Sequence, residues 1–338
     1  MKQCMMFAGK KVAITFFTFL ACLLWLNNTE MQAAENIFDD LLGVSFPNEK
    51  DGWACGRAGI ILHSENGGDD WHKQKTNTDY TLVSIHFVNA KNGWAVGDEG
   101  VILNTTTGGA SWFKQQSPSS CYLMDVCAVT PLNAWICTEK GEILHTTDGG
   151  TNWKTQYQGD RFKINSVSFY SETIGWAAGE HGFIYRTNDG GNSWLKKAGY
   201  YEFSEYDEIL MGNFIFDIEA VNEKTAWTVG IDGIVTKTED GGDSWHTVET
   251  GAIRTQLFTI ASNNKNILII GGEGELIASR DGGATWCRET LVPSMKYGWI
   301  YSIDHITAEK YIAVGWEGAI YRNENVELNK SWIKLSIN

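Results

Sequence analysis

The sequence predicts an all-β protein built from seven copies of one unit. Pairs of tryptophans 18 residues apart recur along the chain, as in Trp94 and Trp112. A fixed period of about 20–50 residues is typical of a repeat architecture. The 36 glycines, the four prolines and the absence of a helical apolar period after the leader favour short strands joined by tight turns. The second tryptophan of the pair occurs in steps of 41, 41, 41, 51, 41 and 46 residues, at Trp71, Trp112, Trp153, Trp194, Trp245, Trp286 and Trp332.

One unit, residues 82–117, divides into four strands. The ranges 82–88, 94–96, 101–104 and 112–115 are predicted strands, with a tight turn at 98–100 and a glycine-rich hairpin at 105–111. Four antiparallel strands form one blade, so seven units predict a single seven-bladed β-propeller over residues 35–338. The units begin near Val44, Ile85, Val126, Val167, Ile218, Ile260 and Ile303.

Several units depart from the repeat. The sixth has Leu268 in place of its first tryptophan, and the seventh is the most degenerate. Residues Glu35 to Leu42 could add a closing strand to the last blade. The connections at 195–217 and 287–302 are longer than the others, and we expect them on the face where propellers usually bind ligands.

The N-terminus has the order of a secretory signal peptide. Lys10 and Lys11 precede an apolar run from Val12 to Leu26, and the small residues Ala33 and Ala34 follow. Residues 1–34 are therefore a predicted signal peptide, which implies export to the periplasm or the extracellular space. An uncleaved anchor or a lipid on Cys22 are the alternatives.

The charge of the chain excludes some partners. The formal net charge is −14, and it becomes −16 without residues 1–34, which hold three lysines and one glutamate. Such a surface disfavours nucleic acid and anionic membranes, and it favours cationic or neutral partners. Cys55 and Cys137 occupy the repeat position of Val96, so we interpret them as small core residues. We expect a monomer without metal or cofactor.

Four of the hairpins share one acidic motif. Thr146 to Trp153 follows the Asp-box pattern, Ser/Thr-x-Asp-x-Gly-x-Thr/Ser/Asn-Trp. An aspartate before Gly-Gly suits a tight turn, and one carboxylate in each loop is too few for calcium. We therefore predict a structural role for Asp148, Asp189, Asp240 and Asp281.

The repeat resembles the photosystem II stability/assembly factor family. The resemblance rests on Gly-Trp-Ala-Val-Gly-x-x-Gly-x-Ile-Leu, followed by Thr-x-Asp-Gly-Gly-x-Ser-Trp, and it covers residues 44 to 335. It implies an exported, non-enzymatic propeller that binds an assembly intermediate of a membrane protein. Photosynthetic members are associated with a basic patch, whereas this chain has 27 basic and 41 acidic residues.

Asp-box propellers also include glycan-active enzymes. A sialidase needs three arginines around the substrate carboxylate, but Arg186, Arg280 and Arg322 fall on third strands or hairpins, away from the central face. A glycosidase with two carboxylates stays open as an alternative, as does a carbohydrate-binding module. The histidines lack metal-ligand spacing. The favoured prediction is a non-catalytic scaffold that binds a protein partner.

The candidate binding face combines acids with aromatic residues. Carboxylates occur in the turns between second and third strands, at Asp98, Glu99, Glu139, Glu180, Asp232, Glu273 and Glu317. Aromatic residues precede the first strands, at Tyr80, Tyr122, Phe162, Phe214 and Trp299. Propeller geometry puts both sets at one end, where they could bind a basic peptide or a sugar. The alternative is that the acids are solvated and the aromatic residues cap the core.

Overall fold

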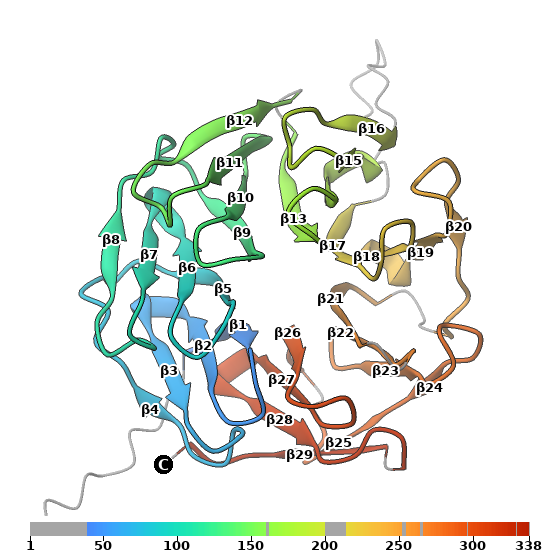
Figure 1. Ribbon diagram of the computed structural model, residues 1–338. Helices are drawn as coiled ribbons and strands as arrows, with labels where there is room; N and C mark the ends of the chain where they lie inside the picture. The colour runs from blue at the N-terminus through green and yellow to red at the C-terminus, as the bar shows by residue number, and fades with distance from the viewer. Residues whose placement is uncertain are drawn as a thin grey trace, which may run out of the picture. The chain divides into compact units, whose positions relative to one another are not determined.

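The computed structural model describes residues 39–159, 162–199, 214–251, 255–263, 266–295, 297–328 and 330–337. The predicted signal peptide and most of the 195–217 connection lie outside these residues. Within residues 37–338, one compact unit, seven antiparallel sheets surround a channel (Figure 1). This confirms the predicted seven-bladed β-propeller. In the described part of the chain, no helix is long and apolar enough to span a membrane.

The first four blades each consist of four consecutive strands, numbered from the channel outward. Blade 1 is β1 (Leu41–Ser45), β2 (Gly52–Gly56), β3 (Ile61–Ser64) and β4 (His72–Lys73). Blade 2 is β5 (Leu82–Phe87), β6 (Gly93–Gly97), β7 (Ile102–Thr105) and β8 (Phe113–Gln115). Blade 3 is β9 (Leu123–Ala128), β10 (Ala134–Thr138), β11 (Glu142–Thr146) and β12 (Lys154–Gln158). Blade 4 is β13 (Ile164–Phe169), β14 (Gly175–Gly179), β15 (Ile184–Thr187) and β16 (Leu195–Ala198).

The last three blades follow the same order, but blade 7 gains a fifth strand. Blade 5 is β17 (Ile215–Ala220), β18 (Ala226–Gly230), β19 (Val235–Thr238) and β20 (His246–Thr247). Blade 6 is β21 (Leu257–Ser262), β22 (Leu268–Gly272), β23 (Leu276–Ser279) and β24 (Cys287–Arg288). Blade 7 is β26 (Ile300–His305), β27 (Tyr311–Gly315), β28 (Ile320–Asn323) and β29 (Ser331–Lys334), with β25 (Thr290–Val292) parallel to β29 at its outer edge.

The fifth strand corrects two expectations. It comes from the 287–302 connection and not from Glu35 to Leu42, whose described end forms the innermost strand of blade 1. The early part of that connection therefore lies at an outer edge, away from the channel. Among the described residues, blades 1 and 7 share no sheet. Side chains join them instead, since Phe46 N–H donates to Asp304 (2.7 Å) and Arg322 pairs with Asp69 (2.6 Å).

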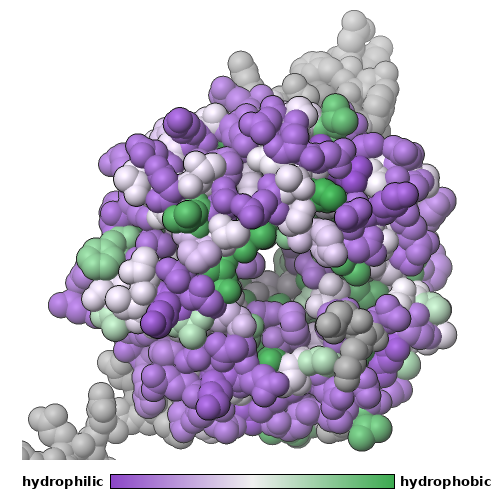
Figure 2. Space-filling view, viewed as in Figure 1, coloured by the Kyte–Doolittle hydropathy of each residue, from purple (hydrophilic) through white to green (hydrophobic). Residues whose placement is uncertain are grey.

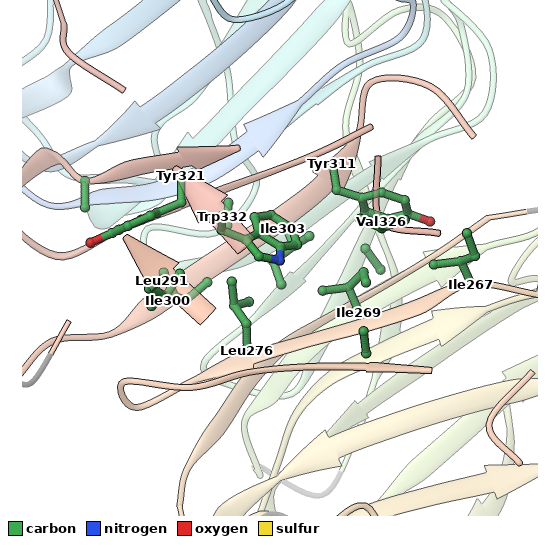
Figure 3. Packing of buried hydrophobic residues seen from close by; sticks show 14 residues of the cluster. Ile267, Ile269, Leu276, Leu291, Ile300, Ile303, Tyr311, Tyr321, Val326 and Trp332 are labelled. Carbon is green, nitrogen blue, oxygen red and sulfur yellow. The ribbon is translucent and has the colours of Figure 1, made fainter. Parts of the chain in front are cut away.

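Apolar side chains fill the space between neighbouring blades. The repeat tryptophan of each second strand is buried against the next blade: Trp53 clusters with Ile85 of blade 2, and Trp135 stacks on Phe169 of blade 4 at 3.7 Å between ring centres. Between blades 6 and 7 the corresponding residue is Ile269, whose cluster includes Trp332 (Figure 3). The prediction that Leu268 replaces the repeat tryptophan is therefore wrong by one position. The turn after this strand is one residue shorter than in the other blades, which shifts the spacing to Trp286.

The Asp-box hairpins fit over these tryptophans. In the hairpin of blade 5, Asp240 accepts hydrogen bonds from the Thr238 hydroxyl (2.9 Å), the Ser244 N–H (3.0 Å) and the Ser244 hydroxyl (2.5 Å). A Cβ on Gly242 would lie 2.9 Å from the Trp176 ring of blade 4. Asp148, Asp189 and Asp281 make equivalent bonds within their own hairpins. The carboxylate thus fixes the conformation of the hairpin. The glycine allows the hairpin to approach the neighbouring ring, because any side chain at its position would clash with that ring.

The turns after the second strands are tied to the starts of the innermost strands. Asp98 N–H donates to the Thr81 carbonyl at 3.0 Å, and the equivalent bond occurs in all seven blades. Six blades have a glycine just before this turn, and a Cβ on Gly97 would lie 1.9 Å from the same Thr81 oxygen. This close approach fixes each turn at the end of the channel.

We expect Gly97→Ala to lower the free energy of unfolding by about 2–4 kcal/mol, because the added methyl group forces two backbone segments apart. Chemical denaturation measures the change. Gly251→Ala is the control: Gly97 is extended, whereas Gly251 has a positive φ (77°) but open space around it, so this substitution should cost only about 1 kcal/mol. Equal losses in the two variants would contradict the close-packing argument.

Candidate functional site

Each innermost strand carries a β-bulge at its second residue. The pairing with the second strand skips this residue in all seven blades, for example between Leu82 and Ser84. A bulge redirects the extra side chain. Here the seven bulged residues line one mouth of the channel, a cavity of about 160 Å³: Leu42, Val83, Met124, Asn165, Phe216, Phe258 and Tyr301. Six of these seven residues are apolar, so the mouth is mostly apolar. Figure 2 views the molecule along the channel and shows a mostly polar surface around the opening.

The aromatic residues of the mouth are concentrated on blades 5, 6 and 7. Ring centres lie 5.2 Å apart for Phe216 and Phe258, 5.8 Å for Phe258 and Tyr301, and 6.0 Å for Tyr301 and Trp299. Trp299 then contacts Trp316 at 6.4 Å. We call these five residues the aromatic arc. Trp299 is 40 % exposed, so the arc offers contact area to a second molecule.

A segment of the 287–302 connection supports the arc. Gly274 N–H of the blade 6 turn donates to the Gly298 carbonyl (2.9 Å), and Glu273 forms a β-bridge with Trp299. The neighbouring Tyr297 is 83 % exposed. The later part of this connection therefore lies on the expected face, unlike β25.

The predicted carboxylates divide into two groups. Three accept backbone hydrogen bonds: Asp98 from Glu99 (2.8 Å), Glu139 from Tyr122 (3.1 Å) and Glu180 from Lys163 (3.1 Å). The other four are exposed, and no hydrogen bond or ion pair of their carboxylates is found within the described residues: Glu99, Asp232, Glu273 and Glu317. Three of these four lie on blades 5, 6 and 7, beside the aromatic arc.

Three of the exposed acids have left-handed backbone. Glu99, Asp232 and Glu317 have φ of 53°, 56° and 52°. A residue with a Cβ is disfavoured there, and glycine or asparagine would cost less. The turn therefore does not need these carboxylates for its own stability, which leaves them available for binding.

The predicted aromatic residues also separate. Trp299 belongs to the arc, and Tyr122 lies near the mouth, where burial and then the charge of Asp98 raise its pKa. Phe162 packs on His181 at 4.6 Å, and Phe214 contacts the same ring at 5.9 Å, so both cover the core. Tyr80 lies under the Lys114 ammonium of the outer strand β8, at 5.9 Å, and does not line the mouth.

Sequence reasoning missed Phe216, Phe258 and Tyr301, and it also missed the acids inside the channel. All seven bulged residues occupy one column of the repeat, directly after the first residue of each innermost strand. That column contains three consecutive aromatic residues in the last three units. Aligning the units on their first strands would have revealed it.

Inside the channel, acids and hydroxyls join the blades. Asp125 of blade 3 accepts from Val167 N–H of blade 4 (3.0 Å), and Asp217 of blade 5 accepts from Ile260 N–H of blade 6 (2.9 Å). The Ser166 hydroxyl lies 3.1 Å from Asp125 and 2.7 Å from Asp217, yet its single proton can serve only one of them. These acids therefore carry out a structural role between blades.

Two channel carboxyls hold their protons to unusually high pH. Burial, and then the nearby charge of Asp125, raises the pKa of Asp217 to about 6. Burial raises the pKa of Glu219 to about 7, against the hydrogen bond from the Ser262 hydroxyl (2.6 Å) and with support from the charge of Asp217. His305, paired with Asp304 at 3.1 Å, has a raised pKa through its hydrogen bond to that carboxylate.

We expect Glu219→Gln to change the dependence of stability on pH. The folded-state pKa of Glu219 lies above the unfolded value of 4.5, so the folded protein binds the proton more tightly. The stability from this group is complete below pH 4.5 and is lost as the pH rises through about 7. The variant should match the wild type at pH 4.5 and exceed it at pH 8 by more than about 1 kcal/mol in urea denaturation. Parallel pH profiles would show that the carboxyl has no raised pKa.

Comparisons with known proteins agree on the fold. The family model described as "Photosynthesis system II assembly factor YCF48" matches residues 70–155, 114–201 and 202–334. No curated protein matches the chain. A solved structure titled "YCF48 bound to D1 peptide" is 20% identical, with a TM-score of 0.69 over 85% of this chain and 92% of that chain. YCF48 from Cyanidioschyzon merolae is also 20% identical, with a TM-score of 0.69 over 85% and 96%.

A glycoside hydrolase shares the architecture as well. The GH74 xyloglucanase from Xanthomonas campestris is 12% identical, with a TM-score of 0.72 over 89% of this chain and 55% of that chain. Likeness at these identities concerns the fold, because one fold serves many functions. The family match rests on the sequence and spans most of the repeats. The chain belongs to the photosynthesis system II assembly factor YCF48 family.

Proposed function

We propose that this protein is an exported, non-catalytic assembly factor that binds a segment of a membrane or exported protein at the channel mouth. The observation that carries the proposal is the aromatic arc. It lies beside three exposed carboxylates that make no hydrogen bond or ion pair with the part of the chain that the structure describes: Asp232, Glu273 and Glu317. Family membership supports the assembly role, and one related propeller is described as bound to a D1 peptide.

The mouth favours a segment that combines an apolar side chain with a cation. An apolar side chain buried against the arc contributes about 1.5–3 kcal/mol. The exposed acids add attraction for lysine or arginine, which mainly sets orientation and association rate. Such a partner segment would be anchored by its apolar residue and oriented by its charge.

The charge of the mouth distinguishes this chain from members with a basic patch. Among the turns between second and third strands, the cations are Arg57 and Lys140, and Arg57 is paired with Asp40 at 2.8 Å. Carboxylates are the majority, so the client differs in charge from one that needs a basic surface.

The glycosidase alternative has weaker support. Hydrolysis needs two carboxyl groups facing a cleft, one of them free to transfer a proton. Asp125 and Asp217 are instead committed to backbone N–H groups of neighbouring blades. The acids at the mouth lie on exposed turns.

Partner capture tests the proposal. The chain with Phe258→Ala, Asp232→Asn, Glu273→Gln and Glu317→Asn should lose at least about tenfold of the protein captured from the native membrane fraction, since anchor and charge are both removed. Mass spectrometry of the captured proteins measures this loss. Asparagine tolerates the left-handed turns, so folding is preserved.

A matched variant controls for total charge. Glu49→Gln, Glu65→Gln and Glu223→Gln neutralise three exposed acids at the opposite ends of the strands, and capture should be unchanged. Undiminished capture by the mouth variant would exclude the mouth as the binding site. Recovery of the native protein only from the cytoplasm would contradict export.

A further inference from the structure

One position of the third strand decides how each groove between neighbouring blades is filled. This position pairs with the repeat tryptophan of the second strand, as His145 pairs with Trp135 and Arg186 with Trp176. In other blades it holds Lys237 and, opposite Ile312, Arg322. The side chain at this position lies beside the hairpin of the next blade.

Blades 4 and 7 fill the groove with a guanidinium. Arg186 lies over the Trp176 ring at 5.1 Å and donates to the Glu223 carbonyl of blade 5 at 2.7 Å. Arg322 of blade 7 donates to the Gly67 carbonyl of blade 1 at 3.0 Å. In blade 5, Lys237 lies over Trp227 at 5.0 Å and pairs with Glu239 at 2.8 Å. In these three blades, a cationic side chain of the protein itself therefore occupies the groove.

Blade 3 lacks that cation. His145 stacks flat on Trp135 at 4.6 Å, and its Nδ1 lies 3.2 Å from the side-chain nitrogen of Gln156, which also donates to the Gly190 carbonyl at 2.9 Å. A groove of about 760 Å³ is left between blades 3 and 4, on the part of the ring that Figure 1 labels β10 to β15. Burial lowers the pKa of His145 to about 4, so the ring is neutral at physiological pH. Within the described residues, no cation lies over Trp135 as Arg186 lies over Trp176, and the groove beside it holds the neutral side chains of His145 and Gln156.

The lining of this groove suits a positive group. Asp148, Glu172 and Asp189 face it, against one cation, Lys154. Glu172 occupies the repeat position of Glu223, whose main-chain carbonyl accepts from Arg186. One oxygen of the Glu172 carboxylate accepts from Asn133 at 2.7 Å.

The two preceding grooves do not offer the same chemistry. Blades 2 and 3 have Ala90 and Pro131 at the position of Glu172. Thr107 also replaces the Asp-box aspartate in blade 2. Of these three grooves, the one between blades 3 and 4 combines a large volume with several acidic residues in its lining.

We propose that the groove between blades 3 and 4 binds a guanidinium or ammonium group of another molecule, at the place equivalent to that of the Arg186 guanidinium in the next groove. The group could come from an arginine of a bound protein or from a free polyamine. This site is separate from the channel mouth, so it does not depend on the proposed function.

Exchanging the residues of the two grooves tests the site. Isothermal titration of the full-length protein at low salt with N-acetylarginine amide, and separately with spermidine, should reveal one site in the wild type. His145→Arg should weaken binding at least tenfold and raise the melting temperature, because the new guanidinium fills the groove. His145→Ala, which keeps the groove open, should retain binding. Arg186→His should add a second site.

The outcomes separate the explanations. Binding of the arginine amide alone supports a protein arginine as the ligand, and binding of spermidine alone supports a polyamine. Equal affinity of the wild type and His145→Arg for both probes would overturn the proposal, as would no binding to the wild type. Heat released by glucose but by neither cation would also overturn it, since a neutral ligand would then be preferred.

Discussion

The structure depends on the contact between the repeat tryptophan of one blade and the Gly-Gly hairpin of the next. The tryptophan of the second strand extends into the neighbouring blade. The hairpins of blades 5 and 6 cover it so closely that a Cβ on Gly283 would lie 2.2 Å from Trp227, and in blades 2 to 4 the same glycine meets the side chain of Gln74, Gln115 or Gln156. The Asp-box carboxylate holds the hairpin in the shape that allows this approach. Three features of the repeat, tryptophan, aspartate and paired glycines, therefore serve a single interface.

This interface leaves the opposite end of each blade free to vary. There the backbone is fixed by the bond from each turn to the start of the innermost strand, which uses main-chain atoms alone. The backbone of the ring therefore does not dictate which side chains stand in the turn and in the bulge. That freedom explains why an aromatic arc can occupy blades 5 to 7 while Leu42, Val83 and Met124 occupy the same column elsewhere.

The sequence was sufficient for the fold because the fold repeats. Tryptophan spacing gave the number of blades, and the glycine turns gave the strand boundaries. The carboxylates of the turns could be placed at one end for the same reason. The bulges could not be predicted, since a bulge changes pairing without leaving a special residue type. An alignment of the units shows that Phe216, Phe258 and Tyr301 share one column, but only the bulge places that column at the mouth. Ile269, and not Leu268, occupies the repeat-tryptophan position of blade 6, because the following turn is one residue shorter. Only the strand pairing reveals this shift.

The insertion at 287–302 shows why length alone does not locate a binding loop. Its first part adds β25 to an outer edge through parallel pairing, and its last part presents Tyr297 and Trp299 near the mouth.

Both candidate sites select positive charge, but at opposite ends of the repeat unit and for different reasons. At the mouth, Asp232 and Glu317 lie at left-handed turn positions, where glycine or asparagine would cost less. In the groove between blades 3 and 4, acidic residues line a place where the next groove holds Arg186 of the chain itself. Because salt screens charges beyond about 8 Å at physiological ionic strength, the net charge of the chain cannot produce either preference by itself. Preference for a positive ligand has to come from acidic residues that lie close together, such as Asp148, Glu172 and Asp189. Such a group occurs where one blade differs from the others in the residues at the repeat positions.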